Sequence, residues 1–266
     1  MRTMLCFLAL TLCAHGASAQ PSAEDVSFPS GKLKLHGALW KPAGAGPFPT
    51  IVWNHGSEKN PTTKPELGAF FTSHGYVFFV PYRRGQGGSP GPYIQDLVES
   101  ASRFSRGARM IELQEEDNAD VVAAVTYLKS QTFVDAERMA ISGCSYGGIQ
   151  TLLSGEKELG VKALIPFAPG AMSWANTPEL QVRLKRAVDN AKAPIFLVQA
   201  ANDFNTAPSH ELAREAQFRH VDFRTKIYPP FGSTPEEGHG KFCSTATSVW
   251  GNDVLGFLDA HLGGAR

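Results

Sequence analysis

The sequence predicts an α/β fold with a mostly parallel central sheet and helices on both faces. Short continuous apolar runs, typical of strands buried on both faces, recur at residues 50–53, 76–80, 161–167 and 194–200. Segments with helical periodicity separate these runs along the chain. A glycine-rich corner at residues 143–147 joins another apolar run to the start of a helix. Alternation of strand and helix favours parallel strand pairing.

The remaining elements follow in order. Residues 26–40 alternate and contain two glycines, which predicts a leading strand hairpin, and residues 42–49 read as a loop. The last strand is expected at residues 223–228, while residues 90–107 give no clear prediction. Helical patterns cover residues 65–74, 109–130, 178–190, 209–220 and 248–262. Because residues 169–193 hold a single helix between two strands, we expect a small lid or none, and an open site for modest substrates.

The first residues read as a secretory signal peptide. Arg2 is followed by an apolar run at residues 5–14, too short to span a bilayer, and then by Ala17-Ser-Ala19, an A-x-A cleavage site. A lipid anchor on Cys13 is the alternative, but Leu12 is large for the residue before a lipidated cysteine. We therefore expect residues 1–19 to be removed and residues 20–266 to form one exported domain, with no membrane anchor after cleavage.

Charge excludes two classes of partner. The chain of 266 residues has 25 basic and 25 acidic side chains, so it lacks the electrostatic footprint of a nucleic-acid or membrane-surface protein. A cluster of basic residues on the helix at 178–190 and just after it is expected to be a solvated face; it comprises Arg183, Lys185, Arg186 and Lys192.

Two cysteines, Cys144 and Cys243, remain after signal removal. An exported protein folds in an oxidising compartment, so the pair could form a disulfide between the two loops that carry candidate catalytic residues. Two separate buried thiols are the alternative, because a sequence does not give the Cα separation that a bridge requires.

The corner at residues 143–147 has the pattern G-x-S-x-G, with Ser145 at its centre. In such a turn, small residues two before and two after the serine leave its hydroxyl exposed as a nucleophile. A serine hydroxyl needs a base to accept its proton, a third group to orient the base, and backbone N–H groups to bind the oxyanion.

Candidates for these partners follow later strands. Asp203 comes three residues after the buried run at 194–200 and is the preferred acid over Asp189 and Asp222. His239, in the loop Gly238-His-Gly240, is the preferred base, because the other histidines after Asp203 lie in or beside helices or near the terminus.

The oxyanion donors are expected to be the backbone N–H groups of Ser57, which follows an early buried strand, and Tyr146. Tyr82, Trp174 and Phe204 are candidate pocket walls. Arg83 and Arg84 are expected to hold loops by hydrogen bonds, binding of a substrate carboxylate being the alternative. The adjacent acidic residues 115–117 point in different directions on a helix, so we expect a solvated face rather than a carboxylate pair or a metal site.

Several motifs in order resemble those of the α/β-hydrolase superfamily, especially its dienelactone hydrolase-like and prolyl-oligopeptidase-like branches. They are His55-Gly-Ser57, Tyr82-Arg-Arg-Gly-Gln-Gly-Gly88, Gly143-Cys-Ser-Tyr-Gly-Gly148, Asn202-Asp203 and Gly238-His-Gly240. The resemblance covers nearly all of residues 20–266 and has the chain order serine, aspartate, histidine. Two departures stand out: dienelactone hydrolases carry cysteine at the nucleophile position, whereas here Cys144 lies one residue early, and no propeller domain precedes the first strand.

The resemblance implies a serine hydrolase that cleaves small or medium carboxylic esters through an acyl-enzyme, without cofactor or metal. An aminopeptidase or amidase acting on short peptides is the alternative enzyme. A non-catalytic binding protein on the same scaffold is the alternative from another class, disfavoured because Ser145, Asp203 and His239 are all present.

Overall fold

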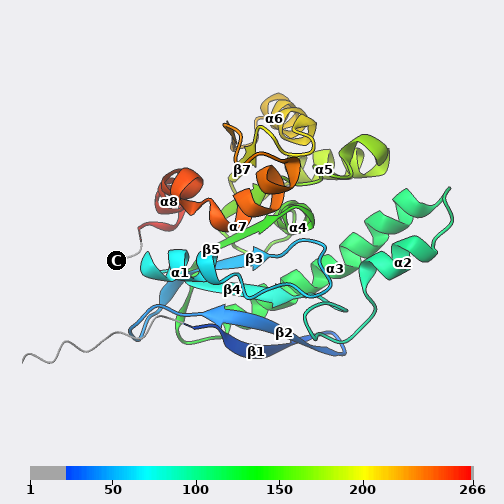
Figure 1. Ribbon diagram of the computed structural model, residues 1–266. Helices are drawn as coiled ribbons and strands as arrows, with labels where there is room; N and C mark the ends of the chain where they lie inside the picture. Colours follow the sequence, from blue (N-terminus) through cyan, green and yellow to red (C-terminus); the bar gives the residue numbers. More distant parts are fainter. Residues whose placement is uncertain (1–21, 265–266) are drawn as a thin grey trace, which may run out of the picture.

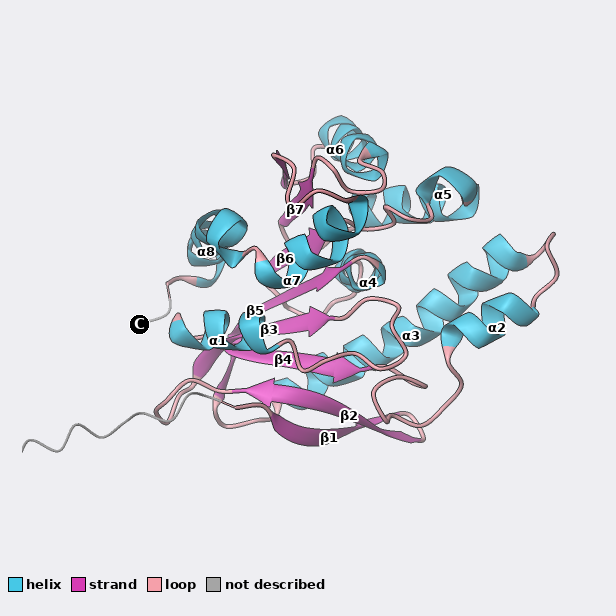
Figure 2. Cartoon of the chain, viewed as in Figure 1, coloured by secondary structure: helices cyan, strands magenta, loops and turns pink. Residues whose placement is uncertain are grey.

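The computed structural model describes residues 22–264, which form one eight-stranded sheet with helices on both faces (Figures 1 and 2). The strand order is β1-β2-β4-β3-β5-β6-β7-β8; β1 and β2 pair antiparallel, β2 and β4 likewise, and all other neighbours are parallel. The strands span Glu24–Ser30, Leu33–Trp40, Phe48–Asn54, Val77–Tyr82, Val134–Cys144, Ala163–Phe167, Ile195–Ala200 and Phe223–Tyr228. The predicted α/β architecture is confirmed.

Helices cover the two faces of the sheet in separate groups. The longer helices of one group, α3 (Arg106–Lys129), α4 (Tyr146–Gly155), α5 (Pro178–Asp189) and α6 (Ala207–Arg219), pack into one apolar cluster. On the other face, α1 (Pro65–Ser73), α7 (Phe242–Thr245) and α8 (Thr247–Leu262) pack into a second. Strands β3 to β7 contribute side chains to both clusters, which explains their continuous apolar sequences.

One helix lies in residues 90–107, the segment without a clear prediction. Helix α2 (Ile94–Ser100) packs on α3, and Figure 2 shows both helices projecting beyond the carboxyl ends of the parallel strands. Ile94 is buried and Leu97 and Val98 are partly buried. These three residues have the i, i+3, i+4 spacing of a helix face. The helix has only seven residues, however, which is too short for hydrophobic periodicity to identify it from the sequence.

The acidic and basic surface predictions were partly wrong. Asp117 of α3 is buried, with a hydrogen bond from the Tyr146 hydroxyl at 2.9 Å, while Glu116 is exposed as expected. Arg183 of the predicted solvated basic cluster is ion-paired with Glu115 and Glu156. The helical pattern alone does not reveal that other elements cover these side chains.

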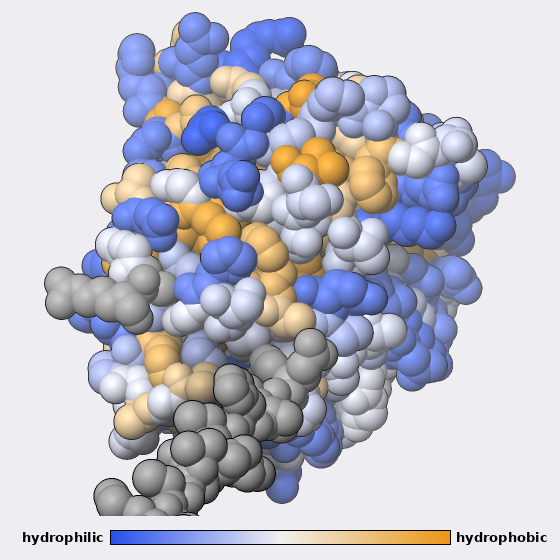
Figure 3. All heavy atoms as spheres, turned by 60° about the vertical axis from the view of Figure 1, so that its left-hand side comes forward, coloured by the Kyte–Doolittle hydropathy of each residue, from blue (hydrophilic) through white to orange (hydrophobic). Residues whose placement is uncertain are grey.

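The helices in the described part of the chain do not include one that is both long enough and apolar enough to cross a membrane. On the face shown in Figure 3, hydrophilic side chains surround small separate apolar patches. Residues 1–21, and with them the expected signal peptide, lie outside the described part.

The tightest backbone contact lies where β5 passes into α4. A Cβ atom on Gly147 would lie 1.9 Å from the Asn54 carbonyl oxygen, and one on Gly143 would lie 2.5 Å from the Gly147 carbonyl oxygen. Strand pairing sets this approach, because Asn54 at the end of β3 pairs with Gly143 of β5. Glycine is therefore required at both positions.

We predict that Gly147→Ala lowers the free energy of unfolding by about 2 kcal/mol or more, because the new methyl group must displace the β3 backbone. Urea unfolding followed by circular dichroism would measure it. The matched control is Gly256→Ala in an exposed turn of α8, where a Cβ atom has no neighbour within 4 Å; the gain there is about 0.5–1 kcal/mol. Equal stabilities for the two variants would contradict the prediction.

Candidate active site

Ser145 lies at a strained corner between β5 and α4. Its φ of 59° and ψ of −117° are unusual for a residue other than glycine, and its N–H donates to the Phe167 carbonyl at 2.9 Å. Helix α4 begins at the next residue, so the Tyr146 N–H is one of the helix's first four, which have no acceptor within the helix. The nucleophile turn predicted from G-x-S-x-G has the expected strand-turn-helix context.

His239 and Asp203 lie together, as predicted. The His239 Nδ1 lies 2.8 Å and 3.0 Å from the two carboxylate oxygens of Asp203. That carboxylate also accepts hydrogen bonds from the Phe204 N–H at 2.6 Å and the Gln199 side chain at 2.9 Å. One correction applies: His239 lies in a π-helical turn, Glu237–Lys241, rather than in an open loop. The turn continues into α7 and so holds the imidazole on a regular element.

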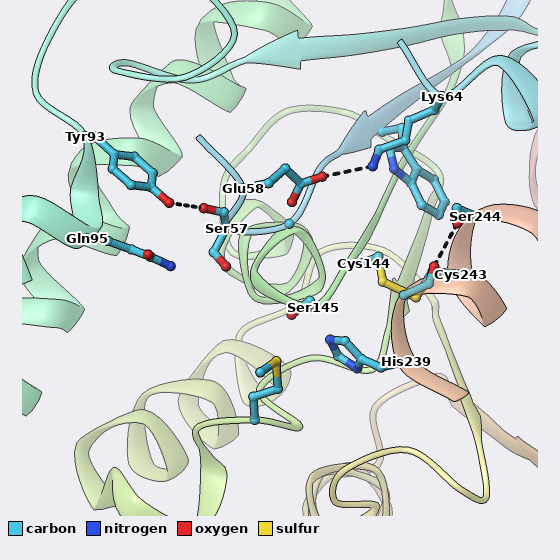
Figure 4. A pocket seen from close by; sticks show the side chains of 14 residues that line it. Ser57, Glu58, Lys64, Tyr93, Gln95, Cys144, Ser145, His239, Cys243 and Ser244 are labelled. Carbon is cyan, nitrogen blue, oxygen red and sulfur yellow. Dashed lines mark hydrogen bonds and ion pairs between the residues drawn. A yellow bond between two sulfur atoms is a disulfide. The ribbon is translucent and has the colours of Figure 1, made fainter. Parts of the chain in front are cut away.

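Ser145 and His239 line the same cavity (Figure 4). The His239 side chain is largely buried, and its Nε2 has no hydrogen-bond partner within residues 22–264. With Nδ1 engaged by Asp203, Nε2 is the ring nitrogen left to exchange a proton in the cavity. The hydrogen bond between a catalytic serine and its histidine is often long in a free enzyme and shortens when substrate binds.

A disulfide joins Cys144, beside the serine, to Cys243 in α7, with a Cα separation of 6.0 Å. Figure 4 shows it in the wall of the cavity. Because it links the end of β5 to the helix that follows His239, it ties together the segments carrying Ser145 and His239. The structure therefore contains the bond that the sequence left open.

The loop after β3 is held by a buried arginine. Arg83 donates to the His55 carbonyl at 3.1 Å and to the Gly56 carbonyl at 2.6 Å, and its side chain is fully buried. In a trans peptide the carbonyl and the following N–H point in opposite directions, so this bond fixes the direction of the Ser57 N–H. Tyr93 donates to the Ser57 carbonyl (Figure 4). Arg84 binds Asp120 at 2.8 Å, so both arginines hold loops as predicted.

Asp117 links α3 to this network. Its carboxylate accepts a hydrogen bond from the hydroxyl of Tyr146, the residue after Ser145, and lies 3.8 Å from the Arg83 guanidinium. Burial raises the pKa of Asp117 from 3.8 to about 6, against the opposing effect of Arg83. Burial, together with Asp117, raises the pKa of the Tyr146 hydroxyl well above its usual value. The phenol is therefore a donor to Asp117 at all physiological pH values.

Two adjoining cavities meet at Ser145. Cavity A, of about 340 Å³, is lined by Glu58, Lys64 and His239 and by the disulfide. Cavity B, of about 380 Å³, is lined by apolar side chains of α2, α3 and α4 together with Gln114. Ser57, Gln95, Ser145 and the exposed Met172 line both.

The predicted pocket walls need correction, because none of the three lines either cavity. Tyr82 packs beside His55 and Gly87, and Trp174 is buried in the core with its indole N–H donating to Glu211 at 3.0 Å. Phe204 instead packs edge-on against the His239 ring, with centroids 5.5 Å apart. Closeness to a motif in the sequence does not show which side chains line a cavity in space.

Part of the wall comes from the segment without a clear prediction, because Ile94 and Val98 of α2 line cavity B. Met110 and Gln114, in the helix expected at residues 109–130, line it as well. The i, i+3, i+4 spacing of Ile94, Leu97 and Val98 is the sequence signal from which helix α2 could have been predicted. No cluster of three or more His, Cys, Asp or Glu side chains suited to a metal ion occurs within residues 22–264.

The fold and this site define the class of protein. An eight-stranded, mostly parallel sheet with a serine at a strand-to-helix corner and a buried histidine–aspartate pair after later strands is an α/β hydrolase. The family model for the dienelactone hydrolase family matches residues 35–248. The chain belongs to the dienelactone hydrolase family and is a dienelactone hydrolase-like hydrolase.

Similar proteins include both peptidases and esterases. An uncharacterized peptidase, YtmA of Bacillus subtilis (strain 168), is 24% identical over 77% of this chain and 84% of its own length. The Pyrococcus horikoshii acylaminoacyl peptidase has a TM-score of 0.68 at 19% identity over 93% of this chain, which spans only 43% of that protein. A Pyrococcus furiosus esterase has a TM-score of 0.64 at 15% identity, covering 91% of this chain and 92% of the esterase. The two structural likenesses show the fold alone.

We predict that Asp117 makes the protein less stable as the pH rises from about 4 to about 7. The folded chain retains a proton up to about pH 6 that the unfolded chain loses near 3.8, so this stability is complete below 3.8 and is lost as the pH passes 6. Urea unfolding at about pH 5 and about pH 7.5 should show that Asp117→Asn removes about 1–3 kcal/mol of this dependence. The exposed Glu116→Gln should not. Parallel pH dependence in wild type and Asp117→Asn would contradict the assignment.

Proposed function

We propose that the protein is a serine hydrolase that cleaves carboxylic esters of small or medium size through an acyl-enzyme. The observation that carries this proposal is the joint position of Ser145 and His239 in one cavity, with the His239 Nδ1 2.8 Å from Asp203. This geometry leaves the imidazole Nε2 free to take a proton from the serine. The dienelactone hydrolase family and the esterase neighbour support the same chemistry.

In the proposed mechanism the Ser145 hydroxyl attacks the ester carbonyl while His239 Nε2 accepts its proton. Asp203 holds the Nδ1–H tautomer and stabilises the imidazolium. The tetrahedral oxyanion is bound by the N–H groups of Tyr146 and Ser57, the latter directed by the Arg83 hydrogen bond to the Gly56 carbonyl. His239 then protonates the leaving alcohol. In the second half of the reaction His239 takes a proton from water, which attacks the acyl-enzyme, and then returns the proton to Ser145 as the acid is released.

We expect a fluorophosphonate probe to label the folded protein at Ser145, because an activated serine attacks phosphorus as it does a carbonyl. Peptide mapping would locate the label. Ser145→Ala should lose the label and about 10⁴-fold or more of ester turnover with the fold retained, and Asp203→Asn should lose about 10⁴-fold through the wrong histidine tautomer. A folded protein that takes no label would refute the assignment and favour a binding protein on this scaffold.

An aminopeptidase or amidase is the second candidate, supported by the peptidase relative. Comparison of p-nitrophenyl acetate with aminoacyl p-nitroanilides separates the two activities. We expect a higher kcat/KM for the ester, since amide cleavage requires protonation of a poorer leaving group. A higher value for an anilide would favour the peptidase.

We also propose that the protein is exported after removal of residues 1–19. Besides the signal sequence, the Cys144–Cys243 disulfide supports this, because such bonds persist in oxidising compartments. Mass spectrometry of the native protein should find Gln20 at its start and Cys144 linked to Cys243. Two free thiols on an intact N-terminus would contradict export.

A further inference from the structure

The two cavities that meet at Ser145 differ in one decisive respect: His239 lines cavity A and does not line cavity B. In the proposed reaction His239 must reach the leaving-group oxygen in order to protonate it. The leaving group therefore lies on the side of cavity A. Cavity B adjoins Ser145 and is not lined by His239, so it is the space open to the acyl chain.

Cavity B has an apolar body. Ile94 and Val98 of α2, Met110 of α3 and Ile149 of α4 contribute to its lining. Of the described residues that line it, only Glu99 carries a charge, and that side chain is exposed at the rim. A charged acyl group would leave water here without a buried counter-charge, so the cavity favours neutral acyl groups.

One polar side chain interrupts this apolar lining. Gln114 lies one helical turn after Met110 on α3 and is 1% exposed, yet its Oε1 has no hydrogen-bond partner within residues 22–264. A buried polar atom without a partner is costly, and native proteins keep few of them.

Two buried amide oxygens of α3 lack a hydrogen-bond partner within residues 22–264, those of Gln114 and Asn118, and of these two residues only Gln114 lines cavity B. Asp117 accepts the Tyr146 hydroxyl, Asp120 binds Arg84, and the Asn118 amide nitrogen donates to Gln150 and Ser154. Among the polar residues of α3, Gln114 is the one that lines cavity B. An amide combines an acceptor oxygen with two N–H donors and bears no charge.

We infer that cavity B binds the acyl group of the substrate, and that Gln114 selects acyl chains with an apolar body and a neutral hydrogen-bonding group, a primary amide or a hydroxyl, near the far end. This inference rests on the proposed hydrolase function. A substrate group that donates to Oε1 satisfies a buried acceptor, whereas an alkyl end leaves it without a partner. Sites built to hydrogen-bond a substrate discriminate strongly against analogues that lack the bond.

The test uses p-nitrophenyl esters whose acyl chains end in a carbamoyl group after three, four or five methylene groups. Each is paired with an ester in which an isopropyl group, which has the same number of heavy atoms, replaces the carbamoyl group. Rates with Ser145→Ala protein are subtracted as background. At the chain length that reaches Gln114, wild type should prefer the carbamoyl ester by about tenfold to hundredfold in kcat/KM. Gln114→Met, which keeps the length of the side chain, should remove this preference and raise turnover of the isopropyl ester.

Gln95→Leu is the matched control, because Gln95 also lines cavity B but is exposed to water; it should keep the preference for the carbamoyl ester. Fluorophosphonate labelling of Ser145 in every variant reports an intact site. Two results would overturn the role of Gln114 but leave the proposed hydrolase function intact: labelled wild type with no preference at any chain length, or a preference that survives Gln114→Met. Absence of labelling in folded wild type would refute the proposed function and this inference with it.

Discussion

The close approach of the β3 and α4 backbones at Gly147 is the constraint on which the site depends. Because Asn54 pairs with Gly143 and its carbonyl nearly touches Gly147, the chain must turn sharply at Ser145 and enter α4 at once. The same pairing places the loop that follows Asn54 beside the first turn of α4. Ser57 and Tyr146, which are far apart in the chain, therefore both line the cavity beside Ser145. The strained φ of Ser145 persists because this packing leaves no room for relaxation.

Behind this corner, a buried polar network replaces part of the apolar core. Arg83 connects the loop after β4 to the carbonyls of the loop after β3, and Asp117 connects α3 to Tyr146 of α4. Burial of these charges is unfavourable, which the raised pKa of Asp117 reflects, but hydrogen bonds and the guanidinium partly offset it. The network gives the Ser57 N–H a fixed direction, which a loop held only by apolar contacts would lack. In the proposed mechanism this fixed direction suits the Ser57 N–H to bind an oxyanion.

The predictable parts of the molecule were those in which local sequence and global environment agree. Strands β3 to β7 are buried on both faces and so read as continuous apolar runs, and Ser145 was recognisable because its turn requires glycine at fixed positions. Trp174 was placed wrongly because an aromatic ring serves equally well in a core or a pocket, and here its N–H finds Glu211 inside the protein. Asp117 was placed wrongly because helical spacing does not show which element covers a face. Helix α2 is too short for its spacing to stand out.

The sequence by itself determined the sheet, the turn at Ser145 and the pairing of His239 with Asp203. Strand burial and a glycine-bounded turn leave strong local patterns, and the acid and the base were found from their positions after later strands. Only the tertiary structure decided that His239 lies in a π-helical turn, that Cys144 and Cys243 are bonded, and that α2 and α3 form the wall of cavity B. The disulfide depends on the distance between two residues that lie 99 positions apart in the chain, and the cavity wall depends on how α2 packs on α3. Neither the distance nor the packing is encoded by a local pattern of residues.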